Sequence, residues 1–150
     1  MIVLGSDHAG FELKEKLKRY FNKKNIEFFD AGAVELNKND SYVDYGKGAI
    51  EYYLQNCDEN ADKLILICGS GVGMSIVANR HEKIRAVLAY SAKQAVQGRQ
   101  HNNCNCLCLG ARNICFLKAK FIISKFLNTD FLGGKYADRL KSIWGKFLYT

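Results

Sequence analysis

Five short apolar runs alternate with longer stretches of helical periodicity along this 150-residue chain. Each run is short enough to be a buried strand. Because successive parallel strands are joined by crossover helices, the alternation predicts a parallel sheet with helices on both faces. The predicted strands are 2–4, 26–29, 64–68, 86–89 and 106–109. The predicted helices are 11–24, 44–55, 73–79, 92–100, 114–126 and 136–147.

The same pattern predicts a single domain over residues 1–150. A chain of this length can bury a core of its own, and no proline, repeat or glycine/serine-rich linker divides it. The first apolar run is too short for a secretory signal and lacks its basic flank. No apolar run approaches the roughly 18 residues that span a bilayer. We therefore expect a soluble, cytoplasmic protein with no membrane partner.

Six cysteines raise the alternatives of disulfides or a metal site. A cytoplasmic chain with its own core keeps its thiols reduced, and no C-x-x-C pair occurs. Cys104, Cys106 and Cys108 alternate as residues on one face of a strand do. Since free cysteine is commonly buried, we expect these three to pack as small apolar side chains and expect no metal.

The formal net charge of +7 suits several partners. Nucleic acid, a membrane surface and a small anion are all compatible with a basic protein. Much of the excess lies in one amphipathic stretch, which we expect to be a solvated helix face. Its basic residues are Lys14, Lys16, Lys18, Arg19, Lys23 and Lys24.

Glycine-rich and polar segments lie where ligands gather in a parallel sheet, beyond the carboxyl ends of the strands. The first predicted strand leads into residues 5–10 and the third into 68–73. A polar run at 99–103 precedes the fifth strand, and we expect all three segments to meet at one edge. The asparagine- and lysine-rich stretch 34–41 is the best candidate for a mobile loop.

Glycines at 69, 71 and 73 predict a turn whose amides face an anion. They permit tight backbone geometry, and the positive end of the following helix supports negative charge. The spacing fits neither a P-loop nor a dinucleotide fingerprint, whose third glycine would fall on Met74. The turn therefore indicates an anion or oxyanion site rather than a nucleotide site.

Cys68 immediately precedes this turn, and a helix N-terminus favours the thiolate. It is a candidate base or nucleophile; the alternative is one more buried cysteine in an apolar strand. His101 lies in a polar run and is a candidate acid/base group. His8 is either a site residue or a surface residue. Asp7, beside it, is expected to fix the tautomer of His8 or to hold a substrate hydroxyl.

Five motifs in order resemble the ribose-5-phosphate isomerase B and galactose-6-phosphate isomerase family. They are GSDHAGF at 5–11, ICGSGVG at 67–73, RQHN at 99–102, GAR at 110–112 and GGKYADR at 133–139. The resemblance covers essentially the whole chain. It implies a Rossmann-like three-layer α/β/α sandwich, usually a homodimer with active sites at the subunit interface, with tetramers left open. It also implies interconversion of ribose 5-phosphate and ribulose 5-phosphate without metal or cofactor.

Carried onto these positions, the resemblance implies a role for each site residue. Cys68 is the base that moves a proton between C1 and C2, His101 opens the furanose ring, and Ser70 lies near the reacting oxygens. The implied substrate-binding set comprises Asp7, His8, Tyr42 and Asn102 for the sugar, Gly69, Gly71, Val72 and Gly73 for a cis-enediolate, and Arg112, Lys135 and Arg139 for the phosphate, with His8 assisting.

Two positions depart from the family pattern. Lys135 stands where arginine is common, and lysine keeps the charge but loses the bidentate fork. Val43 follows Tyr42 where proline is common, which leaves the placing of Tyr42 open. At Met74 some members carry a catalytic glutamate, so Cys68 together with Met74 fits the cysteine-using branch.

Two other functions stay open on the sequence. A six-carbon substrate, such as allose 6-phosphate or galactose 6-phosphate, would use the same chemistry. A sugar-phosphate sensor or a nucleic-acid-binding surface would be a different class, and neither needs Cys68 and His101 in catalytic positions. We therefore expect a small sugar phosphate as ligand and no nucleic-acid partner.

Overall fold

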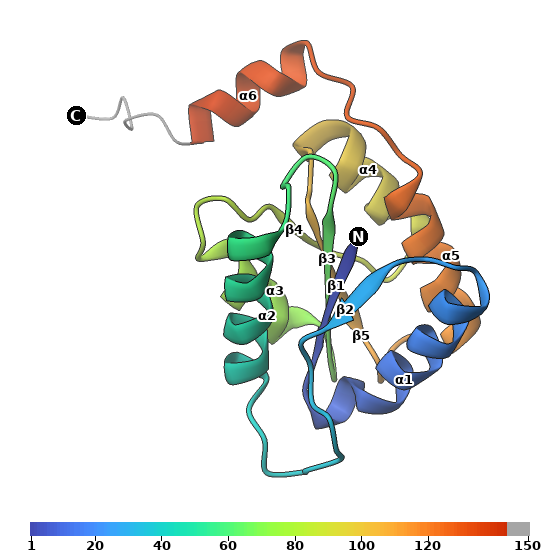
Figure 1. Cartoon of the computed structure of the whole chain (residues 1–150). Helices are drawn as coiled ribbons and strands as arrows, with labels where there is room; N and C mark the ends of the chain where they lie inside the picture. Colours follow the sequence, from blue (N-terminus) through green and yellow to red (C-terminus); the bar gives the residue numbers. More distant parts are fainter. Residues whose placement is uncertain (144–150) are drawn as a thin grey trace.

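The computed structural model describes residues 1–143, in which five strands alternate with helices (Figure 1). The strands are β1 (Ile2–Ser6), β2 (Phe28–Asp30), β3 (Lys63–Cys68), β4 (Ala86–Leu88) and β5 (Cys106–Gly110). The helices are α1 (His8–Lys23), α2 (Tyr42–Asn56), α3 (Val72–Asn79), α4 (Ala92–Asn102), α5 (Phe116–Leu127) and α6 (Lys135–Ile143). Every predicted strand and helix is present, with ends shifted by a few residues.

All five strands are parallel and lie in the order β2-β1-β3-β5-β4. This confirms the predicted α/β fold with a five-stranded parallel sheet. β1 and β3 are neighbours in the middle, with β2 beyond β1 and β5 beyond β3. The chain therefore winds in opposite directions from this pair. Such a switch point leaves a crevice outside the carboxyl ends of the two strands, where ligands bind in open α/β sheets.

Helices cover both faces of the sheet, with α2 and α3 on one face and α1, α4 and α5 on the other (Figure 1). Alternation along β3 supplies both cores. Ile65 and Ile67 pack toward α1 and α5. Leu64 and Leu66 pack toward α2 and α3. All four side chains are completely buried, and each contributes about 1.5–3 kcal/mol relative to an exposed position.

α6 extends away from the body of the molecule and approaches α4 (Figure 1). None of its residues is buried. The α6 residues Leu140 and Ile143 line a cavity that residues of α4 also line. Ile143 is 58% exposed. The predicted helix 136–147 thus begins at Lys135, and positions 144–147 lie outside the described residues.

Several helices are longer than predicted, and in α1 and α4 the difference places histidines of interest in helical turns. α1 begins at His8 because Asp7 caps it, its Oδ1 accepting an amide hydrogen bond from the first turn at 3.0 Å. α4 continues to Asn102. Its C-cap is Asn103, whose backbone is left-handed. His101 therefore lies in the last turn of α4 rather than in a loop.

Lys14 is not part of a solvated face, and that expectation is wrong. Its side chain is completely buried on the inner side of α1. The Lys14 Nζ donates to Asp30 Oδ2 at 2.6 Å and to the Ala33 carbonyl at 2.7 Å. The ion pair and the hydrogen bond to the carbonyl replace the water contacts that the ammonium loses on burial. The exposed basic residues of α1 are Lys16, Arg19 and Lys23.

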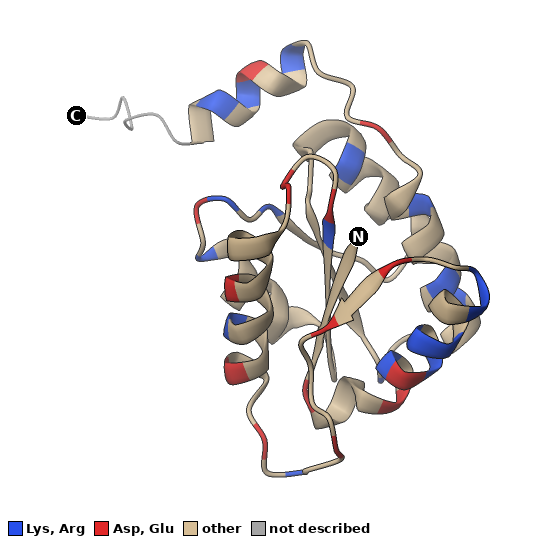
Figure 2. Ribbon diagram, in the orientation of Figure 1, with Lys and Arg blue, Asp and Glu red and all other residues tan. Residues whose placement is uncertain are grey.

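The surface charge is mixed. Figure 2 shows Lys and Arg positions gathered on α1 and α6, with acidic positions among them. Within residues 1–143, no helix is both long and apolar enough to cross a membrane.

The cysteines before and within β5 are buried as expected, but they do not share one face. Cys106 and Cys108 pack in the core beside α2 and α3, whereas Cys104 precedes the strand and packs in the opposite core. Burial raises the pKa of the Cys104 thiol to about 11. Burial, reinforced by the Cys108 thiol, also raises the pKa of Cys106. Cys104 and Cys106 are therefore thiols at neutral pH.

Candidate active site

A cavity of about 440 Å³ opens beyond the carboxyl ends of β1 and β3. The two strands pair in register up to Ser6 and Ile67, so the segments that follow them emerge side by side. This confirms that residues 5–10 and 68–73 meet at one edge. The cavity is lined by Asp7, His8, Ala9, Tyr42, Cys68, Gly69, Ser70, Val72, Gly73, Ile76 and Arg112.

Cys68 ends β3 and is buried, with 4% of the residue exposed. Its Sγ accepts a hydrogen bond from the Gly71 amide at 3.2 Å. An amide hydrogen aimed at sulfur stabilises negative charge there, as does the nearby N-terminus of α3. Cys68 therefore differs from Cys106 and Cys108, whose thiols hydrogen-bond only to each other among the described residues.

The turn after Cys68 requires glycine at position 71. Gly71 has a φ of +80°, and a Cβ there would lie 2.9 Å from the Leu109 carbonyl carbon. The Ser70 carbonyl accepts a hydrogen bond from the Tyr90 hydroxyl at 2.5 Å, which ties the turn to the segment after β4. Ser70 Oγ accepts from the Val72 amide at 3.2 Å. The next amides of α3, those of Gly73 and Met74, have no intrahelical acceptor and are available to a ligand.

Two glycines leave room for neighbouring side chains. A Cβ on Gly69 would lie 2.9 Å from the Arg112 guanidinium, and a Cβ on Gly73 would lie 2.6 Å from the Tyr42 ring. Arg112 is anchored by its own amide, which donates to the Gly69 carbonyl at 2.9 Å. Within residues 1–143 its guanidinium forms no ion pair. Val43 in place of proline does not keep Tyr42 from lining the cavity.

His8 is held by Asp40, a residue that the sequence reasoning missed. Asp40 Oδ1 accepts from the His8 amide at 3.1 Å and lies 2.5 Å from His8 Nδ1. The expectation that Asp7 fixes the His8 tautomer is therefore wrong, because the Asp7 carboxylate caps α1 instead. Asp40 lies 32 positions along the chain in the stretch expected to be a mobile loop. No local pattern could reveal this contact.

The remaining predicted residues lie elsewhere in the same chain. Because α4 runs back from the carboxyl edge of the sheet, His101 and Asn102 reach the amino edge, where β5 begins. We expected residues 99–103 to meet residues 5–10 and 68–73 at one edge of the sheet. Within a single chain this expectation is wrong. Arg99 is a buried structural residue whose guanidinium donates to the carbonyls of Thr129 and Cys104.

His101 forms a second group with α6. Its ring stacks on Tyr136 with the centroids 4.5 Å apart. Lys135 Nζ and Arg139 Cζ lie 5.3 and 5.7 Å from the centre of the same Tyr136 ring. The structure thus gathers three predicted residues around Tyr136, which the sequence reasoning did not single out. We call His101, Asn102, Lys135 and Arg139 the α4–α6 group.

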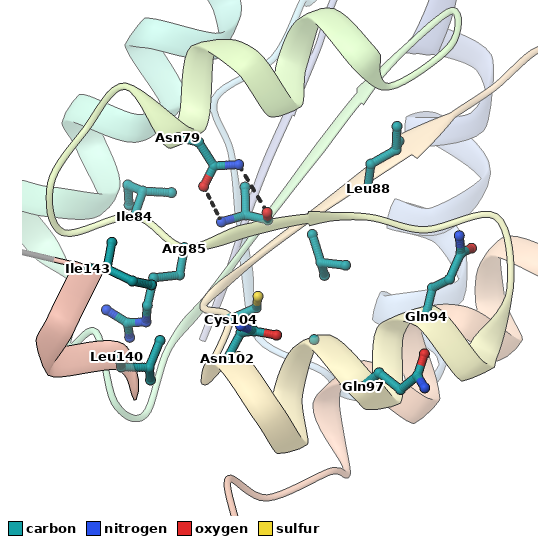
Figure 3. Close-up of a pocket in the computed structure, with 13 residues that line it drawn as sticks. Asn79, Ile84, Arg85, Leu88, Gln94, Gln97, Asn102, Cys104, Leu140 and Ile143 are labelled. Carbon is teal, nitrogen blue, oxygen red and sulfur yellow. Dashed lines mark hydrogen bonds between the residues drawn. The ribbon is translucent and has the colours of Figure 1, made fainter. Parts of the chain in front are cut away.

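Asn102 lines a larger, mainly apolar cavity of about 660 Å³ between α3, β4, α4 and α6 (Figure 3). On one side Asn79 pairs with the edge strand, donating to the Ala86 carbonyl at 3.0 Å and accepting from its amide at 2.9 Å. On the other side Leu140 and Ile143 of α6 face this space. The cavity contains none of the residues around Cys68.

Comparison with known proteins assigns the family. A family model described as Ribose/Galactose Isomerase matches residues 2–143. The ribose-5-phosphate isomerase B of Escherichia coli (strain K12) is 34% identical over 142 residues, which cover 95% of this chain and 93% of that protein.

Solved structures agree in fold and sequence. A ribose 5-phosphate isomerase of Thermotoga maritima matches with a TM-score of 0.87 and 44% identity, covering 95% of each chain. The ribose-5-phosphate isomerase B of Mycoplasma genitalium, solved with bound ribulose-5-phosphate, matches with a TM-score of 0.88 and 34% identity over 95% of this chain and 92% of that chain. The matches span the described sheet, its helical layers and the Cys68 turn, and this chain therefore belongs to the ribose/galactose isomerase family.

Proposed function

We propose that the protein is an aldose–ketose isomerase that interconverts D-ribose 5-phosphate and D-ribulose 5-phosphate. The observation that carries the proposal is the Cys68 sulfur, held beneath an amide-rich turn in a cavity that the Arg112 side chain also lines. The name of the Escherichia coli relative and the ligand in the Mycoplasma genitalium structure support this substrate. Because phosphorylated sugars are charged and do not cross bilayers unaided, we expect the enzyme to act in the cytoplasm.

The reaction needs a base and a place for negative charge. Removing a proton from the carbon beside a carbonyl creates a cis-enediolate, so donors must lie where the oxygen becomes anionic. In the proposed mechanism Cys68 takes the proton from C2 and returns it to C1. Ser70 and the amides of residues 69–73 stabilise the enediolate oxygens. Neither a metal nor a cofactor takes part.

The rest of the cavity suits a sugar phosphate. Asp7, His8 and Tyr42 line its wall and would hold the sugar hydroxyls. Arg112 would bind the phosphate through its bidentate fork. Met74, where a glutamate base would stand in other members of the family, is completely buried and does not line the cavity. This supports Cys68 as the base.

We propose that a second copy of the chain completes each site in a homodimer. The α4–α6 group is separated from Cys68 by the length of the sheet, so a symmetric pair is needed to place His101 beside the substrate as the ring-opening acid/base. Lys135 and Arg139 of the second copy would then reach the phosphate. Two features favour such a partner: no residue of α6 is fully buried within its own chain, and Ile76 at the cavity rim is 57% exposed.

The first test measures ribulose 5-phosphate formation by purified protein in EDTA. Cys68→Ala should lower kcat by roughly 10²–10⁴-fold, the usual contribution of a positioned base. Cys115→Ala is the matched control, because this exposed cysteine makes no capping hydrogen bond at α5. Isomerase activity that persists unchanged in Cys68→Ala would refute the assigned base. Comparing kcat/KM for five- and six-carbon phosphates then identifies the preferred substrate.

The second test decides whether sites are shared. Cys68→Ala and His101→Asn chains, each with its own affinity tag, are co-expressed and the mixed dimer is isolated. In a shared arrangement one of its two sites is intact and the other lacks both groups, so the mixed dimer should show about half the wild-type activity although each parent is inactive. A mixed dimer as inactive as its parents would place both residues in a single-chain site.

A further inference from the structure

Asp40 makes two hydrogen bonds to one residue. Its Oδ1 accepts from the His8 backbone amide at 3.1 Å and lies 2.5 Å from His8 Nδ1. The Asp40 side chain is 6% exposed and the His8 side chain is 26% exposed. When Asp40 is ionised its carboxylate only accepts, and the hydrogen between the two groups then belongs to Nδ1. The contact therefore selects one tautomer of the ring.

The backbone holds Asp40 in place from both sides. The Asp40 amide donates to the Asn37 carbonyl at 3.1 Å, which closes a turn before it. Ser41, directly after it, caps α2 by accepting the Val43 amide at 3.2 Å. The carboxylate is thus fixed between a hydrogen-bonded turn and a helix start. This is the arrangement expected of a group that orients a neighbour.

We propose that Asp40 is a positioning residue that keeps His8 in the Nδ1–H tautomer, so that Nε2 accepts a hydrogen bond from a substrate hydroxyl. The inference rests on the proposed function, since it takes a sugar phosphate as the occupant of the cavity that His8 lines. A neutral imidazole with Nδ1 protonated has only an acceptor left at Nε2. A phosphate dianion offers acceptors only, whereas a sugar hydroxyl can donate. In this proposal His8 binds the sugar and does not assist with the phosphate as the resemblance implied, so the phosphate is left to arginine and lysine.

The Asp7 carboxylate does not compete for this role. The ligand atoms of Asp7, His8 and Asp40 lie within 4.8 Å of one another. Asp7 Oδ1, however, is engaged by the amide of the first turn of α1. Of the two carboxylates, Asp40 alone contacts the His8 ring among the described residues.

The direct test is the protonation state of His8, read by long-range ¹H–¹⁵N NMR of the full chain at about pH 8, above the usual titration range of histidine. The His8 signals are assigned from their absence in His8→Asn. Wild-type protein and Asp40→Asn, which keeps an acceptor oxygen, should show the Nδ1–H tautomer. Asp40→Ala should show a mixture of tautomers. A wild-type His8 that is an imidazolium or carries its hydrogen on Nε2 would overturn the proposal.

Kinetics separates positioning from a merely structural role. Losing one oriented hydrogen bond should raise KM for ribose 5-phosphate about tenfold in Asp40→Ala and only a few-fold in Asp40→Asn, with kcat changing less. Asp44→Asn, an exposed acid in the same segment, is the matched control. His8→Asn keeps a donor for Asp40 but removes Nε2. In that background Asp40→Ala should change KM less than about twofold, because coupled residues are not additive.

The outcomes distinguish the two proposals. An equal effect of Asp40→Ala with and without the His8 ring would mean that Asp40 acts only on the loop, and would overturn its role toward His8. An unchanged KM in His8→Asn would show that the His8 ring does not contact the substrate, and would overturn the proposal. Failure of the proposed function would appear differently, as folded wild-type protein without isomerase activity, and the NMR spectrum would still decide the tautomer.

Discussion

Replacing Lys14 by methionine should destabilise the protein strongly, although lysine-to-methionine changes on a helix surface are usually harmless. The Lys14 Nζ pairs with Asp30 Oδ2 at 2.6 Å and also satisfies the Ala33 carbonyl. Breaking a buried ion pair costs about 3–5 kcal/mol. Asp30 keeps Lys18, whose Nζ lies 2.7 Å from the same oxygen, so we expect the low end, about 3 kcal/mol. This corresponds to a fall in Tm of roughly 6–12 °C for a chain of this size.

The loss should depend on pH. Burial alone would raise the pKa of the Asp30 carboxyl, but hydrogen bonds from Lys14 and Lys18 outweigh it and hold this pKa below its usual value. A carboxyl with a depressed folded-state pKa stabilises the fold fully above its unfolded value of about 3.9, and this contribution fades as acid protonates the folded state. The gap between Lys14→Met and wild type should therefore be full at neutral pH and shrink in acid.

Urea unfolding followed by circular dichroism at one fixed protein concentration measures both effects. Lys16→Met, an exposed change on the same helix, should stay within about 0.5 kcal/mol of wild type. A Lys14→Met variant as stable as the Lys16→Met control would refute the reasoning, because Lys14 would then behave as a solvent-exposed residue. A gap that did not narrow in acid would remove Asp30 as the partner responsible.

Three further outcomes are expected. Gly71→Ala should destabilise the fold by at least about 1 kcal/mol, through its left-handed φ and close backbone contact, and should also lower kcat in a steady-state assay; wild-type stability would contradict this. Lys135→Arg should lower KM for ribose 5-phosphate by regaining the bidentate fork, and an unchanged KM would end its assignment to the phosphate. Exposed Cys115 should react with a thiol reagent at about pH 8 before Cys104, whose raised pKa keeps it a thiol until the protein unfolds.

The layered fold could be predicted because its signals are local. The runs that became β1, β3 and β5 are apolar without interruption since both faces of these strands are covered. The turn after Cys68 could also be found, because glycine spacing and a strand end are visible in a short window. The α/β class and the core of the candidate site therefore follow from sequence patterns within about ten residues.

What the sequence did not reveal depends on contacts between distant residues. Asp40 reaches His8 across 32 positions, and the Tyr90 hydroxyl reaches the Ser70 carbonyl across 20. His101 was expected at the wrong edge, although residues 99–103 directly precede the fifth strand and in a parallel sheet therefore lie at its amino edge. This error could have been avoided from the order of the predicted elements alone.

The separation of α6 from the core has a consequence for how such an enzyme can change over generations. The cations proposed to bind the phosphate, Lys135 and Arg139, belong to a helix with no buried residue. Substitutions there avoid the cavities and strain that make core changes harmful. Substrate preference can therefore drift at α6 while the sheet, the Cys68 turn and the thermal stability of the body are preserved. Lysine in place of the common arginine at position 135 is a change of this kind.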